Sequence, residues 1–275
     1  MRTLVLGGSG QLGTEFVRVL SGAIAPRRGE FDLADTTRIE KHIRSVAPDL
    51  IINCAAYTAV DAAEEDEGTA RLVNGTAVGE LARAAAALGI PFVTFSSDYV
   101  FDGSDDQPYV ESASVTPINA YGRSKALAEE LALSYPGSLV IRTSWLLSAT
   151  HPNFVTTILA RTATAPTEVV DDQWGRPTLV SDLAPAVLDA LDRGFTGVLH
   201  LASPPATTWF DLARAACRAA KIDPDRVVPC ATKDYPGRAL RPRYSVLKSE
   251  RVDPLPDWRD GLSELVAAIV ADRSM

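Results

Sequence analysis

Two side chains that can hold and move a proton stand four positions apart at residues 121 and 125. The segment Ala-Tyr-Gly-Arg-Ser-Lys (120–125) is typical of a helix, so Tyr121 and Lys125 share one helical face. A free phenol titrates near pH ~10 and exchanges protons poorly at neutral pH unless a nearby cation favours its ionised form. The spacing therefore predicts a phenol that acts as an acid or base beside an ammonium group.

A hydroxyl group is expected to complete this pair. The apolar run 91–97 ends in two serines, so Ser96 or Ser97 lies at the carboxyl end of a buried strand. Open α/β sheets bind their ligands at these strand ends. A hydroxyl, a phenol and an ammonium group together suit proton transfer to a carbonyl oxygen. Because Tyr-x-x-x-Lys also occurs often by chance, the surrounding elements must support this interpretation.

The elements that would position these groups begin with a glycine-rich loop. The short apolar strand 3–6 leads directly into Gly7, Gly10 and Gly13, and an apolar helical pattern follows. Glycine lets the backbone approach a pyrophosphate closely, and the N-terminus of the helix supplies N–H donors. A strand, a glycine loop and a helix in this order predict a dinucleotide site.

The residues after the expected second strand, 23–26, indicate which dinucleotide binds. Arg27 and Arg28 stand where an NAD-specific protein usually carries an acidic residue for the ribose 2′-hydroxyl. Two guanidinium groups favour a 2′-phosphate and hence NADPH, with NADH as the alternative. The other interpretation is a solvated pair of loop residues. A third strand, 48–57, ends in small residues against which a flat cofactor can lie.

The composition excludes several classes of function. The chain has 275 residues, of which 46% are hydrophobic and 23% charged, as in a globular protein of one large domain or slightly more. Its net charge of −8 disfavours a nucleic-acid surface. The three cysteines and three histidines show no metal-ligand spacing, so no metal is expected. An apolar strand from residue 3 and the lack of a long apolar run predict a cytoplasmic protein with no membrane partner.

Alternating strands and helices predict the fold class. Helices are expected over 36–46, 64–88, 152–162, 181–191 with Ser181 as its N-cap, 208–221 and 257–272, and strands over 138–143, 168–171 and 197–202. The acidic cluster 64–67 is interpreted as the solvated start of a helix and not as a cation site. The prediction is an α/β protein with a Rossmann-type doubly wound parallel sheet and a smaller C-terminal substrate-binding domain. Residues 1–148 and 180–202 would form the first domain, and residues 149–179 and 203–275 the second.

Several separate segments resemble the dTDP-4-dehydrorhamnose reductase family of extended short-chain dehydrogenases. They are Gly-Gln-Leu-Gly (10–13), Ile-Asn-Cys-Ala-Ala-Tyr-Thr-Ala-Val-Asp (52–61), Ser-Ser-Asp-Tyr-Val-Phe-Asp-Gly (96–103), Tyr-Gly-Arg-Ser-Lys (121–125), Arg-Thr-Ser-Trp (142–145), Asp-Asp-Gln-Trp-Gly-Arg-Pro-Thr (171–178) and Arg-Pro-Arg-Tyr-Ser (241–245). The similarity spans nearly the whole chain. The family usually has threonine where this chain has Ser97, and either hydroxyl can bond a carbonyl oxygen.

The resemblance implies roles for individual residues. The catalytic group would be Ser97, Tyr121 and Lys125. The cofactor would contact Gly7, Gly10, Gln11, Leu12, Gly13, Arg27, Arg28, Asp32, Leu33, Ala55, Ala56, Thr58, Tyr121 and Lys125. The substrate would contact Thr58, Val60, Ser97, Tyr99, Tyr121, Trp145 and Arg241, with Arg241 meeting the diphosphate.

The resemblance also implies a reaction, which is NADPH-dependent reduction of the C4 ketone of a dTDP-4-dehydro-6-deoxy-L-hexose to give dTDP-L-rhamnose. One alternative is a 4-ketoreductase for another dTDP-deoxysugar of secondary metabolism, and another is a non-catalytic NADP-binding regulator. Sugar-nucleotide 4,6-dehydratases share the fold but carry a glutamate after the aspartate, where this chain has Tyr99. Whether the protein forms a homodimer is left open.

Overall fold

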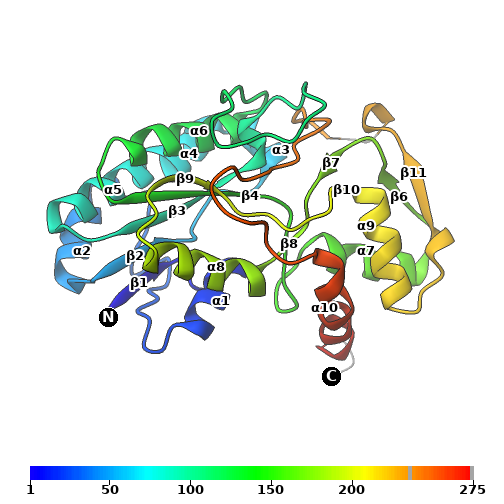
Figure 1. Cartoon of the computed structure of the whole chain (residues 1–275), viewed down its shortest axis with the longest axis horizontal. Helices are drawn as coiled ribbons and strands as arrows, with labels where there is room; N and C mark the ends of the chain where they lie inside the picture. The colour runs from blue at the N-terminus through cyan, green and yellow to red at the C-terminus, as the bar shows by residue number, and fades with distance from the viewer. Residues whose placement is uncertain (235–236, 273–275) are drawn as a thin grey trace.

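The computed structural model describes residues 1–234 and 237–272 and shows a parallel sheet between two layers of helices (Figure 1). The sheet contains, in spatial order, β1 (Thr3–Leu6), β2 (Leu50–Asn53), β3 (Phe92–Ser97), β4 (Ser138–Thr143) and β9 (Gly197–His200). Each neighbouring pair is parallel. Parallel strands need crossover connections, and the helices of these connections cover both faces. The predicted doubly wound α/β class is therefore confirmed.

Successive side chains of each strand enter two different apolar cores. In β1, Leu4 and Leu6 pack on one face of the sheet and Val5 packs on the other. The first face is covered by α2 (Ile39–Val46), α5 (Ala77–Leu88) and α6 (Ala120–Leu133), and the second by α1 (Gln11–Val19) and α8 (Val180–Asp192). Burial on both faces explains why the strands are nearly continuous apolar runs.

The predicted second strand is reduced to a single bridge. Ile24 pairs in parallel with Leu4, and its N–H donates to the carbonyl of Thr3 at 2.8 Å. Since β2 occupies the other edge of β1, the chain turns from one side of β1 to the other between these two segments. This reversal is a topological switch point, and it directs ligands to the carboxyl end of β1.

The expected helical stretch over 64–88 is confirmed from Glu67 to Leu88, but it is not one regular α-helix. Short helices α3 (Val60–Ala63) and α4 (Glu67–Arg71) are followed by a π-helical turn, η2 (Leu72–Thr76), and then by α5. Asp66 caps α4 by accepting from the N–H of Thr69 at 3.0 Å.

The sequence predicts that the acidic residues next to this cap are solvated, but two of them bind other parts of the chain. Glu64 accepts from the N–H of Ala120 at 2.7 Å, and Glu67 pairs with Arg123 at 2.7 Å. The cluster therefore holds the start of α6 in place.

The C-terminal part builds a second apolar core (Figure 1). Helices α7 (Phe154–Thr164), α9 (Trp209–Ala219) and α10 (Trp258–Asp272) surround a parallel pair, β6 (Thr167–Val170) and β11 (Val227–Cys230). Two further short pairs are β5 (Leu146–Leu147) with β8 (Thr178–Leu179) and β7 (Trp174–Gly175) with β10 (Thr207–Thr208). The separate core supports the predicted domain division, whose boundaries stay a prediction.

Helix α8 begins one residue earlier than the sequence predicted. Its N-cap is Leu179, which makes no side-chain capping bond, so the predicted capping role of Ser181 is wrong. The strand pair β5 and β8 ends at Leu179 and carries the chain directly into the helix, which leaves no turn that a serine could cap.

A buried ion pair fixes α6 against the sheet. Arg142 on β4 donates to both carboxylate oxygens of Glu129 on α6, at 2.6 and 2.8 Å, and the two side chains are only 4% and 6% exposed. His200 on β9 lies beside the same guanidinium, with 3.2 Å between its Nε2 and Arg142 Nη1. Burial and the Arg142 charge lower the pKa of His200 to about 4, although the charge of Glu111 opposes this shift. The imidazole is therefore neutral at pH 7.

We expect Glu129→Ala to destabilise the fold by about 3–5 kcal/mol, because it leaves the Arg142 charge buried without its partner. Urea unfolding of wild type and variant measures this change. Glu130→Ala, at the exposed neighbouring position of the same helix, is the matched control and should change stability by less than about 0.5 kcal/mol. Equal effects of the two substitutions would show that the buried pair does not hold α6.

Candidate active site

The start of α6 brings Tyr121 to the end of β3. Asn119 caps the helix by accepting from the N–H of Gly122 at 2.7 Å. A Cβ atom on Gly122 would lie 2.1 Å from the carbonyl oxygen of Tyr99, so only glycine permits this approach. Tyr99 belongs to η3 (Asp98–Val100), the turn that directly follows β3. Helix and strand end therefore meet at the phenol.

Lys125 lies one helical turn after Tyr121 and is buried. Its Nζ donates to the carbonyl of Phe95 at 2.9 Å and lies 5.9 Å from the centre of the Tyr121 ring. Burial lowers the pKa of Lys125 to about 8, and the charge of Glu129 opposes this shift. The ammonium group is thus charged at neutral pH and close to losing its proton.

Of the two serines at the end of β3, the geometry supports Ser97 as the partner of the phenol. Ser97 is within side-chain hydrogen-bonding reach of Tyr121, whereas the buried Ser96 hydroxyl has no hydrogen-bond partner among the described residues. Burial raises the pKa of Tyr121, and the charge of Asp98 raises it further. The bond with Ser97 opposes both effects.

A cavity of about 780 Å³ opens beside Tyr121 at the carboxyl ends of the strands. Thirteen of the predicted site residues line it, namely Gly7, Gly10, Gln11, Leu12, Arg28, Asp32, Leu33, Ala55, Ala56, Thr58, Tyr121, Lys125 and Trp145. The predicted residues outside this lining are Gly13, Arg27, Val60, Ser97, Tyr99 and Arg241. The cavity thus joins the glycine loop to the candidate acid.

Two glycines of the loop keep its backbone compact. Gly7 has a φ of +72°, and a Cβ there would lie 2.6 Å from the amide nitrogen of Ala55. A Cβ on Gly13 would lie 2.1 Å from the carbonyl oxygen of Gly7. Gly13 therefore supports the loop from behind, and Gly10 and Gln11 face the cavity.

The two arginines after Ile24 differ in position. Arg28 lines the cavity, and its Nε lies 3.7 Å from the carboxylate of Asp32. Arg27 is exposed outside the lining, and its backbone N–H donates to Glu30 at 2.8 Å. Arg28 is therefore the better placed of the two guanidinium groups to reach a bound dinucleotide.

A smaller cavity of about 220 Å³ contains Tyr99 and Arg241. Arg241 forms an ion pair with Asp61 on α3 at 2.7 Å, next to Val60. Hydrogen bonding from Arg241 lowers the pKa of Asp61 to about 2, although burial opposes the shift. A diphosphate that meets Arg241 would have to share this guanidinium with Asp61.

Aromatic side chains separate the two cavities. Phe154 and Trp209 line both of them, and Trp145 lines the larger one. The Trp145 and Trp209 rings are stacked, with centres 3.5 Å apart and planes 12° apart. Sequence reasoning missed Phe154 and Trp209, because neither belongs to a motif and each stands at the start of a helix like many core aromatics.

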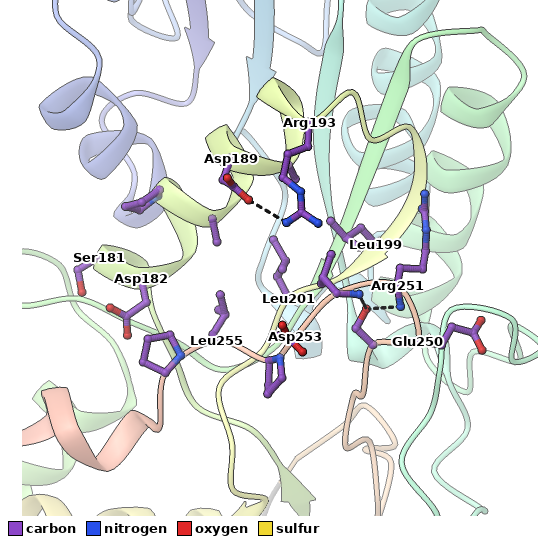
Figure 2. A pocket seen from close by; sticks show the side chains of 17 residues that line it. Ser181, Asp182, Asp189, Arg193, Leu199, Leu201, Glu250, Arg251, Asp253 and Leu255 are labelled. Atoms are coloured by element: carbon purple, nitrogen blue, oxygen red, sulfur yellow. Dashed lines mark hydrogen bonds and ion pairs between the residues drawn. The ribbon is translucent and has the colours of Figure 1, made fainter.

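Figure 2 shows another hollow, of about 730 Å³, between α8 and residues 249–256. Its wall carries charges of both signs, and Asp189 accepts from Arg193 at 3.0 Å. Among the described residues, no predicted site residue lines it. The candidate active site is therefore the cavity beside Tyr121.

Two kinds of feature are absent from residues 1–234 and 237–272. No group of three or more histidine, cysteine, aspartate or glutamate side chains is placed to hold a metal ion. No helix in these ranges combines the length and the apolar composition needed to cross a membrane.

Known proteins resemble the chain over almost its full length. The dTDP-4-keto-6-deoxy-D-glucose reductase of Streptomyces niveus is 37% identical, and the alignment covers 99% of both chains. The dTDP-4-dehydrorhamnose reductase of Burkholderia thailandensis is 40% identical over 94% of this chain and 96% of its own.

Solved structures of enzymes with the latter name are also similar. One, from Clostridium acetobutylicum, has a TM-score of 0.93 at 33% identity and covers 98% of this chain and 100% of its own. Another, from Bacillus anthracis and in complex with NADP, has a TM-score of 0.92 at 28% identity, covering 97% of this chain and 98% of its own. These similarities confirm the resemblance found in the sequence. The model of the RmlD substrate binding domain family matches residues 1–271, and the chain belongs to this family.

Proposed function

We propose that this protein uses NADPH to reduce the C4 ketone of a dTDP-4-dehydro-6-deoxy-L-hexose, with dTDP-4-dehydro-L-rhamnose as substrate and dTDP-L-rhamnose as product. The observation that carries the proposal is the position of Tyr121, between the buried Lys125 ammonium and Ser97 and on the wall of the glycine-loop cavity. Relatives at 37–40% identity are named dTDP-4-dehydrorhamnose reductase. A relative of known structure binds NADP.

The residues of the site divide the chemistry between them. NADPH, when bound, supplies the hydride. Tyr121 gives its proton to the C4 oxygen, and Lys125 stabilises the phenolate that this leaves behind. General acid help of this kind is typically worth ~10²–10⁴ in rate. Ser97, whose proton lies toward Asp98 in this structure, would turn that proton to the ketone oxygen when the substrate binds.

The larger cavity suits the cofactor and the smaller one suits the nucleotide part of the substrate. The backbone of the 7–13 loop can approach a pyrophosphate closely, and Arg28 is placed for a 2′-phosphate. Arg241 and Tyr99 would meet the diphosphate and its sugar. Thr58, Val60 and Trp145 stay predicted substrate contacts, and Arg27 and Gly13 stay predicted cofactor contacts.

A second candidate is a 4-ketoreductase for another dTDP-deoxysugar. The name of the Streptomyces niveus relative favours it. A non-catalytic NADP-binding regulator is less well supported, because the three catalytic side chains are present and close together. Dehydration is disfavoured, since Tyr99 replaces the glutamate that would remove the C5 proton. A homodimer stays a prediction.

The activity is tested by NADPH oxidation with a panel of dTDP-4-keto-6-deoxysugars, followed by NMR of the product. We expect turnover with dTDP-4-dehydro-L-rhamnose and a loss of at least ~10² in kcat for Tyr121→Phe, with NADPH affinity changed only a few-fold. The variant keeps the ring and removes only the transferable proton. Near-normal turnover of Tyr121→Phe would mean that another group is the acid.

We expect Arg28→Ala to raise the KM for NADPH about 5–20-fold and to leave the KM for NADH nearly unchanged, because a charge-assisted phosphate contact is lost. Arg27→Ala is the matched control, since it removes the same charge from a position outside the cavity lining. Steady-state kinetics with NADPH and with NADH give the KM values of both variants for comparison with wild type. If both variants raise the KM for NADPH equally, only the general charge of the loop matters.

The pH dependence should reflect Lys125. Its pKa is lowered to about 8, so its charge is lost as the pH rises through about 8. The kcat/KM for NADPH reports groups of the free enzyme and should fall above that pH. Because the Glu129 charge raises the pKa of Lys125, Glu129→Gln should move this fall to lower pH. A profile that is flat up to about pH 10 in wild type would exclude Lys125 as the titrating group.

A further inference from the structure

A buried carboxylate lies beside Tyr121 and has no part in the mechanism derived above. Asp98, in the turn after β3, is 2% exposed. Ser97 donates to its Oδ1 at 2.9 Å, and Ser245 donates to its Oδ2 at 2.5 Å. Each carboxylate oxygen thus accepts from one serine hydroxyl.

Ser245 reaches Asp98 from a segment far away in the sequence. Its N–H donates to the carbonyl of Trp174 at 2.9 Å, which fixes the segment against β7. Arg241, in the smaller cavity, lies four residues earlier on the same segment. The carboxylate is therefore held between the end of the catalytic strand and the segment that carries the candidate diphosphate residue.

The directions of these hydrogen bonds restrict what Ser97 can do. A serine hydroxyl has one proton, and an ionised carboxylate can only accept. Because Ser97 gives its proton to Asp98, its oxygen is left to accept, and it accepts from the N–H of Tyr99 at 3.2 Å. The bond between Ser97 and the phenol lowers the pKa of Tyr121. Because Asp98 holds the Ser97 proton, that proton is not free to stabilise the phenolate further.

The charge of Asp98 also disfavours the phenolate. Burial raises the pKa of Tyr121 and that of the neighbouring Tyr99, and the charge of Asp98 raises both further. Burial raises the pKa of Asp98 itself to about 6, and the bonds from Ser245 and Ser97 oppose this shift, so the group is ionised at neutral pH. The opposing charges are Lys125 on α6, which favours the phenolate, and Arg241, which lies close to Tyr99.

We propose that Asp98 is a positioning residue that keeps Tyr121 protonated until the ketone arrives. It does so by holding the Ser97 hydroxyl and by facing the phenol with a negative charge. Ser245 holds Asp98 in this role. This inference rests on the proposed function, in which Tyr121 is the acid. A reductase needs the phenol in its protonated form at the start of each turnover, whereas Lys125 alone would promote early loss of that proton. The negative charge of Asp98 thus offsets the effect of the Lys125 charge on the Tyr121 phenol.

An NMR titration of Tyr121 tests this role of Asp98 without measuring turnover. Protein labelled with ¹³Cζ-tyrosine is followed by NMR between about pH 8 and 11, and the resonance missing from Tyr121→Phe identifies Tyr121. We expect Asp98→Asn, which keeps the shape and removes the charge, to begin ionising Tyr121 at least about one pH unit below wild type. Asp189→Asn, in the hollow of Figure 2, loses the same charge far from the phenol and should titrate like wild type.

Kinetics then separate positioning from a merely structural role. We expect Asp98→Asn to lower kcat about tenfold or more, and Ser245→Ala to lower it less. In the double variant, Ser245→Ala should lower kcat almost no further than Asp98→Asn alone, because Ser245 acts through Asp98. An unchanged Tyr121 titration in Asp98→Asn, or additive losses in the double variant, would overturn the proposal. If the wild type reduces no sugar of the panel, the proposed function fails, and the NMR titration still decides the role of Asp98.

Discussion

The hydrogen bond from Lys125 Nζ to the carbonyl of Phe95 fixes the position of α6 against the end of β3. A buried ammonium group must be hydrogen-bonded, and this carbonyl satisfies part of that need within the sheet itself. The bond therefore sets the height of the helix along the strand. Tyr121, one turn earlier, is carried to the strand end with it, and the pair Glu129 and Arg142 secures the same helix farther along.

Two carboxylates connect the C-terminal segment to this arrangement. Asp61 binds Arg241 and also accepts from the backbone N–H groups of Arg238 and Ala239, at 2.9 and 3.0 Å. Asp98 binds Ser245. Asp61 on α3 and Asp98 on η3 follow the carboxyl ends of β2 and β3. The last part of the chain is thus folded back over the site by the same sheet edge that positions the catalytic group.

Much of this could be predicted from the sequence, because strong local signals coincide with the sheet. The glycine loop, the strand before Ser97 and the helix of Tyr121 each have a pattern that needs no distant partner. The failures involve tertiary contacts. The segment at Ile24 has room for only one bridge, η2 is packed on α6, and β11 contains Pro229, which a strand pattern does not favour. The ion pair between Asp61 and Arg241 joins residues 180 positions apart, which no local spacing reveals.

The wall between the two cavities is made of side chains rather than backbone. Trp145 holds its place with a φ of +48°, its ring is stacked on Trp209, and both rings pack against the core of the C-terminal part. Exchanging one of these rings changes the room for a sugar and leaves the strand end, the phenol and the ammonium group in position. One or two substitutions in this wall can therefore change the sugar preference of the enzyme during evolution, while the residues that carry out the reduction stay the same.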